Sequence, residues 1–312
     1  MSVMTTHKGP NGADYSPAAL RAGDLEIGVL SFGARTMYIR HRGKDLILGY
    51  PDPAAYFTDP FYIGAIVGRV ANRLANSRIT IDGKTYPLTA NEGTKQLHGG
   101  PGGVSQVVWD MEPLETGKNG VKLTYSSPDG DQGYPHDVRF EVEVALSETG
   151  LTYHMRAMPS APTAINMAQH NYYSLGPLGD ARLTVPAARY TPVDGDQIPT
   201  GDYADVDGDM FDYRTGAPVH PDIDHNLVLD GAESAIVYEN DTHQLTLHCD
   251  QPGIQVYSGS GLEPPFAPFQ GICLEPQLFP NAFNQEGFDA PLATPEAPYE
   301  QILRIDIAAK VR

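Results

Sequence analysis

Residues 138–157 have the sequence VRFEVEVALSETGLTYHMRA, in which apolar and polar side chains alternate on both sides of a short turn. Every second position from Val138 to Leu146 is apolar, and the same period resumes from Leu151 to Ala157. A period of two is typical of a β-strand with one buried and one exposed face. Since Glu148-Thr149-Gly150 is a turn sequence, the stretch predicts an antiparallel hairpin.

The same period recurs along the whole chain. Residues 78–81 and 84–86 flank Asp82-Gly83, a dipeptide typical of a type I′ turn. The sequence has 32 glycines and 27 prolines but no long amphipathic helical pattern, which favours an all-β fold with few short helices. Further stretches with strand character are Leu25–Leu30, Ala34–Arg40, Val121–Tyr125, Ala235–Tyr238, Gln244–Cys249, Gly253–Ser258 and Gln301–Ala308.

No linker divides the 312 residues. The stretch Thr191–Asp224 is rich in Pro, Asp and Gly, but strand patterns continue on both sides of it, so we interpret it as long loops over a concave face. We therefore predict one β-sandwich domain over residues 1–312, in which residues 1–20 form a peripheral N-terminal segment.

The strongly acidic charge of the chain excludes some classes of binding partner. Lys and Arg number 21 against 39 Asp and Glu, a net charge of −18, which argues against nucleic-acid and anionic-membrane partners. Neither a signal peptide nor an apolar run of membrane-spanning length is evident, so we expect a cytoplasmic protein. The two cysteines, Cys249 and Cys273, lack metal-ligand spacing and are predicted to be buried free thiols, with no metal site.

Several polar segments interrupt the strands without a structural need. They are GRVANR (68–73), QLHGG (96–100), NMAQHNYY (166–173), DIDHN (222–226) and CLEPQ (273–277). A single loop histidine is more often a hydrogen-bonded structural residue, and Arg69 could simply pair with a carboxylate. Glu275 is harder to explain structurally, because it follows the apolar residues 272–274 and a buried carboxylate is costly.

Together these segments resemble the aldose 1-epimerase (galactose mutarotase) family. GRVANR, LHGG (97–100), DGDQGYP (129–135) and LEPQ (274–277) occur in the family's order and at similar spacing. The runs YTPVD (190–194), IPTG (198–201) and DHN (224–226) extend the resemblance over residues 25–307. It implies a galactose mutarotase-like β-supersandwich that binds a sugar in an open groove.

The resemblance also implies an activity and the residues that carry it. The chain would be an enzyme, an aldose 1-epimerase that interconverts the α and β anomers of a free monosaccharide without a cofactor. His170 corresponds to the family's general acid and Glu275 to its general base. The family's substrate-binding positions correspond to Arg73, His98 and Asp224, with Asn72 beside them. Tyr172 is expected to stack against the C–H face of the sugar. The chain departs from the family pattern at Ala168-Gln169, Tyr173-Ser174 and Asn281, which leaves the preferred sugar open.

The chemistry explains why an acid and a base are needed. Opening a hemiacetal ring removes the proton of the C1 hydroxyl and protonates the ring oxygen, and closure reverses both transfers. Apolar neighbours should raise the pKa of Glu275, which suits a base. A carboxylate-rich pocket should keep His170 protonated, which suits an acid.

Alternatives remain. An epimerase for a phosphorylated, sulfonated or uronic sugar would need cations, which Arg69 and Arg73 could supply. A non-catalytic sugar-binding module should have lost His170 or Glu275. A glycosidase would need two carboxylates at one bond, and only Glu275 has a clear motif. We expect a monosaccharide as the partner and a monomer or homodimer as the assembly.

Overall fold

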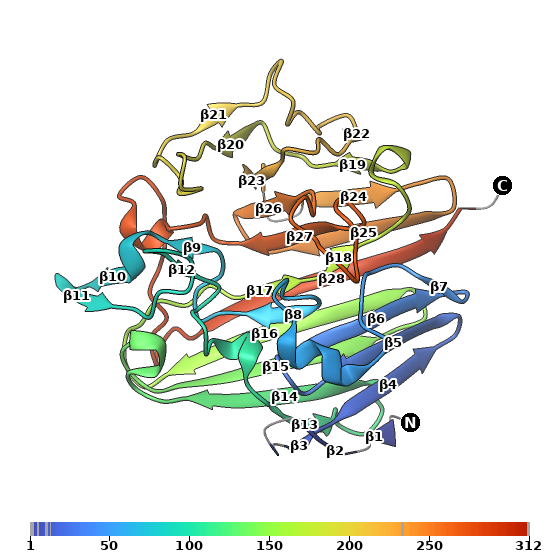
Figure 1. Ribbon diagram of the computed structural model, residues 1–312, viewed down its shortest axis with the longest axis horizontal. Helices are drawn as coiled ribbons and strands as arrows, with labels where there is room; N and C mark the ends of the chain where they lie inside the picture. The colour runs from blue at the N-terminus through green and yellow to red at the C-terminus, as the bar shows by residue number, and fades with distance from the viewer. Residues whose placement is uncertain (1–2, 5, 10–11, 13, 232–233, 311–312) are drawn as a thin grey trace.

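The computed structural model describes residues 3–4, 6–9, 12, 14–231 and 234–310. Nearly all of its regular structure is β-strand (Figure 1), as the alternating patterns predicted. No helix among these residues is long and apolar enough to cross a membrane. The helices of the described part are short 3₁₀ helices: η1 (Pro53–Thr58), η2 (Ala75–Ser77), η3 (Val104–Gln106), η4 (Asp131–Gly133), η5 (Leu178–Asp180) and η6 (Ala282–Asn284).

The largest sheet has nine antiparallel strands and extends from β13 near the bottom of Figure 1 to β22 near the top. The stretch 138–157 forms its hairpin β15–β16, with Val142 opposite Met155. In sheet order the strands are β13 (Asp110–Pro113), β14 (Gly120–Ser127), β15 (Val138–Leu146), β16 (Gly150–Pro159), β28 (Tyr299–Ala309), β25 (His243–Cys249), β24 (Ala235–Glu239), β19 (Arg182–Thr184) and β22 (Ala217–Pro218).

A six-stranded and a five-stranded sheet complete the sandwich. The six-stranded sheet has the order β18 (Tyr172–Tyr173), β27 (Ile272–Gln277), β26 (Gly253–Tyr257), β23 (Asp224–Val228), β20 (Arg189–Thr191) and β21 (Ala204–Asp205). The five-stranded sheet has the order β1 (Val3–Met4), β4 (Pro17–Ala22), β5 (Leu25–Leu30), β6 (Arg35–His41) and β7 (Lys44–Asp45). Two-stranded ribbons pair β10 (Arg78–Ile81) with β11 (Lys84–Pro87), β9 (Arg73–Leu74) with β12 (Gln96–Leu97), β8 (Ala65–Val67) with β17 (Ala168–His170), and β2 (His7–Lys8) with β3 (Asp14–Tyr15).

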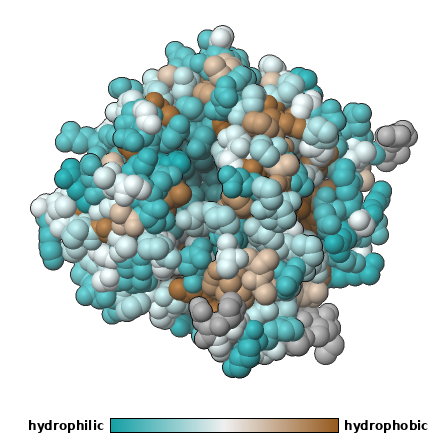
Figure 2. All heavy atoms as spheres, in the orientation of Figure 1, coloured by the Kyte–Doolittle hydropathy of each residue, from teal (hydrophilic) through white to brown (hydrophobic). Residues whose placement is uncertain are grey.

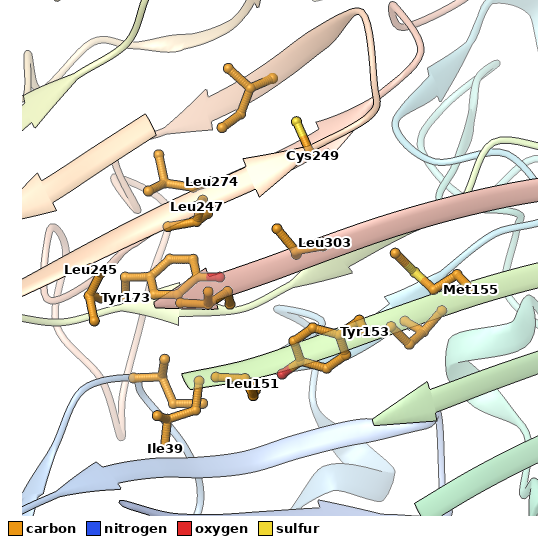
Figure 3. Packing of buried hydrophobic residues seen from close by; sticks show 14 of the residues in the cluster. Ile39, Leu151, Tyr153, Met155, Tyr173, Leu245, Leu247, Cys249, Leu274 and Leu303 are labelled. Atoms are coloured by element: carbon orange, nitrogen blue, oxygen red, sulfur yellow. The ribbon is translucent and has the colours of Figure 1, made fainter. Parts of the chain in front are cut away.

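One large apolar core lies between these sheets. Ile39 of β6, Tyr153 of β16, Leu247 of β25 and Leu274 of β27 belong to the same buried cluster (Figure 3). The alternation along each strand directs one set of side chains into this cluster. The core therefore fixes the register of β27, the strand that carries the LEPQ motif.

The turn at Asp82-Gly83 and the two cysteines are as the sequence predicts, whereas the N-terminal segment differs. Asp82 and Gly83 both have positive φ, 49° and 77°, as a type I′ turn requires. Both cysteines are free and buried, as predicted. The N-terminal segment reaches further into the fold than a peripheral segment would, because β4 begins at Pro17 and buries Ala18 and Leu20 in the main core.

Arg69, a candidate phosphate-binding residue, is used inside the protein. Its guanidinium donates to the hydroxyl and carbonyl of Ser127 and to the carbonyls of Pro128, Pro135 and His136. The residue is 2% exposed. Arg69 therefore holds the loop that contains DGDQGYP and is not available to a substrate.

Replacing Arg69 should destabilise the protein strongly. Arg69→Ala leaves several buried carbonyl groups without a donor, so we expect the free energy of unfolding to fall by at least about 3 kcal/mol. Urea denaturation measures this loss. Arg78→Ala, at an exposed position of β10, is the control and should change stability by no more than about 0.5 kcal/mol. Equal losses in both variants would contradict the structural role of Arg69.

Candidate active site

The site lies on the face of the six-stranded sheet that points away from the main core. On β27, Ile272 and Leu274 enter the core, while Cys273 and Glu275 lie on the opposite face. Register across β23, β26 and β27 places residues in rows, because side chains of paired residues share a face. One row is Asp224, Tyr257 and Cys273, and the next is Asn226, Gln255 and Glu275.

A cavity of about 470 Å³ opens beside this face, and Figure 2 shows a hollow among hydrophilic residues there. This volume is ordinary for a small-molecule site. The structure brings every residue predicted for the site to the lining of this cavity. These residues are Asn72, Arg73, His98, His170, Tyr172, Asp224 and Glu275.

His170 and Glu275 face each other in the buried part of the cavity. The distance between His170 Nε2 and Glu275 Oε1 is 3.7 Å, longer than a hydrogen bond, so each group can still bind a substrate atom. The residues are 5% and 2% exposed. His170 Nδ1 lies 3.6 Å from the Cys273 sulfur, and Glu275 Oε2 has no hydrogen-bond partner among the described residues.

Burial opposes charge on both groups. It raises the pKa of Glu275 well above 4.5, and Asp224 adds to this rise while Arg73 opposes it. Burial also lowers the pKa of His170 to about 4, although its own backbone carbonyl and Asp59 act in the opposite direction. The direction predicted for Glu275 is therefore confirmed. The prediction that carboxylates keep His170 protonated is wrong, because desolvation outweighs them.

His98 is fixed as a neutral hydrogen-bond donor. Pairing of β9 with β12 brings Asn72 beside His98, where the Asn72 backbone N–H donates to His98 Nδ1 at 3.1 Å. The proton of the neutral ring is therefore on Nε2. Burial, with His170 and Arg73 nearby, lowers the pKa of His98 well below 6.5 and keeps the ring uncharged.

The glycine after His98 allows this loop to reach the site. A Cβ atom on Gly99 would lie 1.8 Å from the carbonyl oxygen of Gly68, and Gly99 has a positive φ of 84°. Only glycine permits both the backbone conformation and this contact. The loops that contain the LHGG and GRVANR motifs therefore cross in direct backbone contact.

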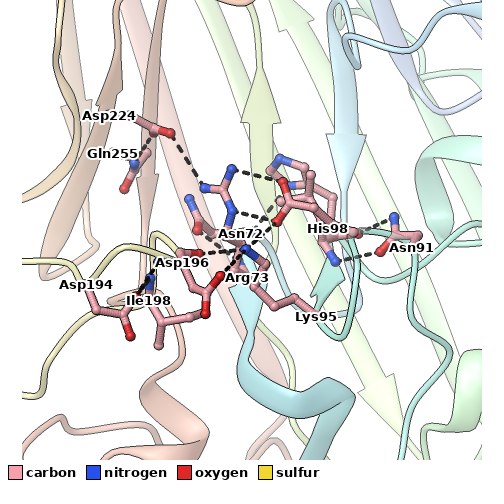
Figure 4. Close-up of polar contacts among 12 residues, drawn as sticks. Asn72, Arg73, Asn91, Lys95, His98, Asp194, Asp196, Ile198, Asp224 and Gln255 are labelled. Atoms are coloured by element: carbon pink, nitrogen blue, oxygen red, sulfur yellow. Dashed lines mark hydrogen bonds and ion pairs between the residues drawn. The ribbon is translucent and has the colours of Figure 1, made fainter.

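Arg73 is neutralised by two carboxylates. Its Nε and Nη2 donate to Glu92 at 2.8 and 3.1 Å, and its Nη1 lies 3.5 Å from Asp224 (Figure 4). Asp224 also accepts a hydrogen bond of 2.6 Å from Gln255. Of these, Glu92 and Gln255 were not predicted. The sequence did contain a signal for Gln255, because it is a polar residue flanked by the apolar Ile254 and Val256 within a strand.

His98, His170 and Glu275 could be taken for a metal site, because their ligand atoms lie within 4.8 Å of one another. A metal needs a lone pair on each histidine. His98 offers none, since Nδ1 accepts from Asn72 and Nε2 carries the proton. The donor set therefore fits a polar organic ligand better than a metal ion.

The chain is also similar to known proteins along most of its length. The family model for aldose 1-epimerase matches residues 18–306. The chain is 32% identical to galactose mutarotase of Bos taurus, with 90% of each chain covered. It is also 32% identical to aldose 1-epimerase of Escherichia coli K12, with 90% of this chain and 91% of the relative covered.

Solved structures show the same fold. Galactose 1-epimerase from Lactobacillus acidophilus NCFM has a TM-score of 0.91 at 23% identity, over 100% of this chain and 99% of that one. An aldose epimerase homologue from C. elegans has a TM-score of 0.87 at 24% identity, over the whole of both chains. The galactose mutarotase-like sandwich is therefore confirmed, and, with the family model and the curated relatives, the chain belongs to the aldose 1-epimerase family.

Proposed function

We propose that this aldose 1-epimerase acts on a free, uncharged monosaccharide, with His170 as the general acid and Glu275 as the general base. The observation that carries the proposal is the distance of 3.7 Å between His170 Nε2 and Glu275 Oε1 at the cavity. The hydroxyl and ring oxygens of a hemiacetal share one carbon atom, so an acid and a base that close together can serve both.

The reaction follows from this pair. Glu275 takes the proton of the C1 hydroxyl while His170 protonates the ring oxygen, and the C1–O5 bond breaks to give the open aldehyde. Rotation about C1–C2 presents the other carbonyl face, and the transfers then run backward. No net proton is consumed, so the pair returns to its starting state after each turnover.

One proton held by the pair is enough for this cycle. Burial favours the neutral form of each group, which shifts that proton toward Glu275. A sugar whose C1 hydroxyl donates to Glu275 stabilises the carboxylate, and its ring oxygen can accept from His170 Nε2. The bound sugar thus supplies the hydrogen bonds that stabilise the pair in its charged form, with Glu275 as a carboxylate and His170 protonated.

The remaining residues have distinct proposed roles. His98 Nε2–H, Arg73 and Asn72 donate to sugar hydroxyls, and Asp224 accepts from one. Tyr172 lies in the cavity wall beside the His170 ring, with centroids 5.2 Å apart, and can pack against the C–H face of the sugar.

The charges at the cavity favour a neutral sugar over the charged alternatives. Arg73, the one Lys or Arg among the described residues of the cavity lining, already has Glu92 and Asp224 as partners. Asp222, Asp224 and Glu275 add carboxyl groups to the same lining. A phosphate, sulfonate or carboxylate would therefore meet like charge, with no unpaired Lys or Arg in the described part of the lining to offset it. A purely binding role would not explain why an acid and a base are buried at an energetic cost.

We also propose that the protein is cytoplasmic and is a monomer or homodimer. Its two cysteines are both free, as in a protein of a reducing compartment, and exposed strands at the sheet edges offer backbone groups for self-association.

Removal of either reacting group should abolish most of the activity. Glu275→Gln or His170→Asn should lower turnover by about 10²- to 10⁴-fold, because each removes one proton transfer. The rate is measured by polarimetry on freshly dissolved α-anomers. Matched controls are Glu300→Gln on β28 and His248→Asn on β25, two positions outside the cavity lining, which should keep the native rate. Native rates in both site variants would contradict the assignment.

A panel of sugars should separate neutral from charged substrates. We expect kcat/KM to be at least about tenfold higher for neutral aldoses, beginning with galactose, than for their 6-phosphates or uronic acids, a difference of about 1.4 kcal/mol. Galactose is included because the mammalian relatives are galactose mutarotases. Faster turnover of a charged sugar would show that the cavity holds a cation site that the neutral-sugar proposal leaves out.

The pKa values of the pair predict opposite effects of pH on stability. Since burial raises the pKa of Glu275, the folded chain keeps a proton that the unfolded chain releases above about pH 4.5, and stability falls as pH rises. Glu275→Gln should therefore gain Tm relative to wild type as pH rises from 4.5 to 8. Since the pKa of His170 falls to about 4, wild type should lose stability between pH 6.5 and 4, and His170→Asn should lose less. Parallel Tm curves for all three proteins would refute this assignment of pKa shifts.

A further inference from the structure

A tight turn over residues 194–198 brings Gln197 to the rim of the cavity. Gln197 has a left-handed φ of 61°, which is uncommon for a residue with a side chain. The Asp194 carboxylate accepts from the backbone N–H groups of Asp196 and Ile198 at 2.9 and 3.0 Å. Asp194 therefore closes an Asx turn that holds Gln197 in this conformation.

Lys95 ties the same turn to the arginine of the site. Its ammonium group donates to the Asp196 carbonyl at 2.7 Å and lies 3.6 Å from Glu92 Oε2 (Figure 4). Glu92 in turn binds Arg73 through two hydrogen bonds. The Lys95 side chain is only 16% exposed, which is unusual for a lysine. The peptide group before Gln197 is thus anchored, through Lys95 and Glu92, to Arg73.

The carboxamide of Gln197 remains available to a ligand. Arg73 and Asp224 have protein partners, but the Gln197 side chain makes no hydrogen bond to any residue that the structure describes. A carboxamide donates and accepts hydrogen bonds, as a sugar hydroxyl does. Gln197 is exposed although the next residue of the turn, Ile198, is buried, so the left-handed backbone of Gln197 presents its side chain to the cavity without packing it in the core.

We propose that Gln197 is a specificity-determining residue whose carboxamide binds one hydroxyl of the sugar, and that Lys95 is the positioning residue that holds its turn beside Arg73. This inference rests on the proposed function, because it assumes that the cavity binds a free sugar. No hydrogen bond or ion pair connects Gln197 with His170 or Glu275 among the described residues. Gln197 therefore selects the sugar and leaves proton transfer to the pair.

The test compares Gln197→Ala and Lys95→Met with wild type on neutral aldoses that differ at one ring carbon, together with the matching deoxy sugars. For the preferred sugar, Gln197→Ala should raise KM about three- to tenfold and leave kcat within about twofold. Discrimination should collapse at one ring carbon only, the one whose hydroxyl Gln197 binds. Lys95→Met should change KM in the same direction by a smaller factor. The controls are Gln244→Ala on β25 and Lys84→Met at the exposed start of β11, which should match wild type.

Binding of each sugar is measured beside turnover, from the shift of Tm with sugar concentration. Unchanged binding and KM in Gln197→Ala, or a loss confined to kcat, would overturn this inference while leaving the roles of His170 and Glu275 intact. Sugar binding that depends on Gln197 without any turnover in wild type would support the inference and reject the proposed function. An equal loss of discrimination at every ring carbon would also overturn it, because one carboxamide binds one hydroxyl.

Discussion

Strand β27 is buried on both faces, and this constraint determines where the reactive carboxyl lies. Its apolar residues Ile272 and Leu274 hold the strand in the main core, so the residue between Leu274 and Pro276 must face the cavity. A slip by one residue would move Leu274 to the cavity and Glu275 into the core. The free energy that stabilises the core therefore also holds Glu275 in a place where burial opposes its ionisation.

Two buried arginines hold loops of this fold, and one of these loops lines the cavity. Arg35 and Asp59 form an ion pair of 2.6 Å with both side chains fully buried. Asp59 also accepts from the backbone N–H groups of Phe61 and Ile63, which anchors the segment that supplies Phe61 to the cavity. Arg69 holds the loop of DGDQGYP differently, by donating to backbone carbonyls, and this loop lies outside the cavity lining. In this acidic chain, both of these arginines stabilise loop geometry, which agrees with a cavity whose described lining has no unpaired Lys or Arg for a charged sugar.

The sequence was sufficient for the features that depend on local pattern. Period-two alternation predicted the sheets because it is a property of short segments, and the family resemblance carried by the motifs implied seven of the residues that line the cavity. The pKa of Glu275 followed from neighbours in its own strand. The pKa of His170 did not, because its surroundings come from distant segments that include Cys273 and Tyr62. For the same reason, the partnership of Glu92 with Arg73 could be seen only once the fold was known.

Two of the departures from the family pattern, Gln169 and Asn281, bind other parts of the protein rather than the cavity. Gln169 donates to the Gly64 carbonyl and to the Asn171 side chain, within the fully buried part of the sheet. The carboxamide oxygen of Asn281 accepts from the Ala75 N–H and so supports the segment that follows Arg73. Neither residue lines the cavity. We therefore expect differences in sugar preference to arise from residues that line the cavity. Gln197 is such a residue, because its side chain lies at the rim and its turn is held by Lys95 rather than by packing in the apolar core.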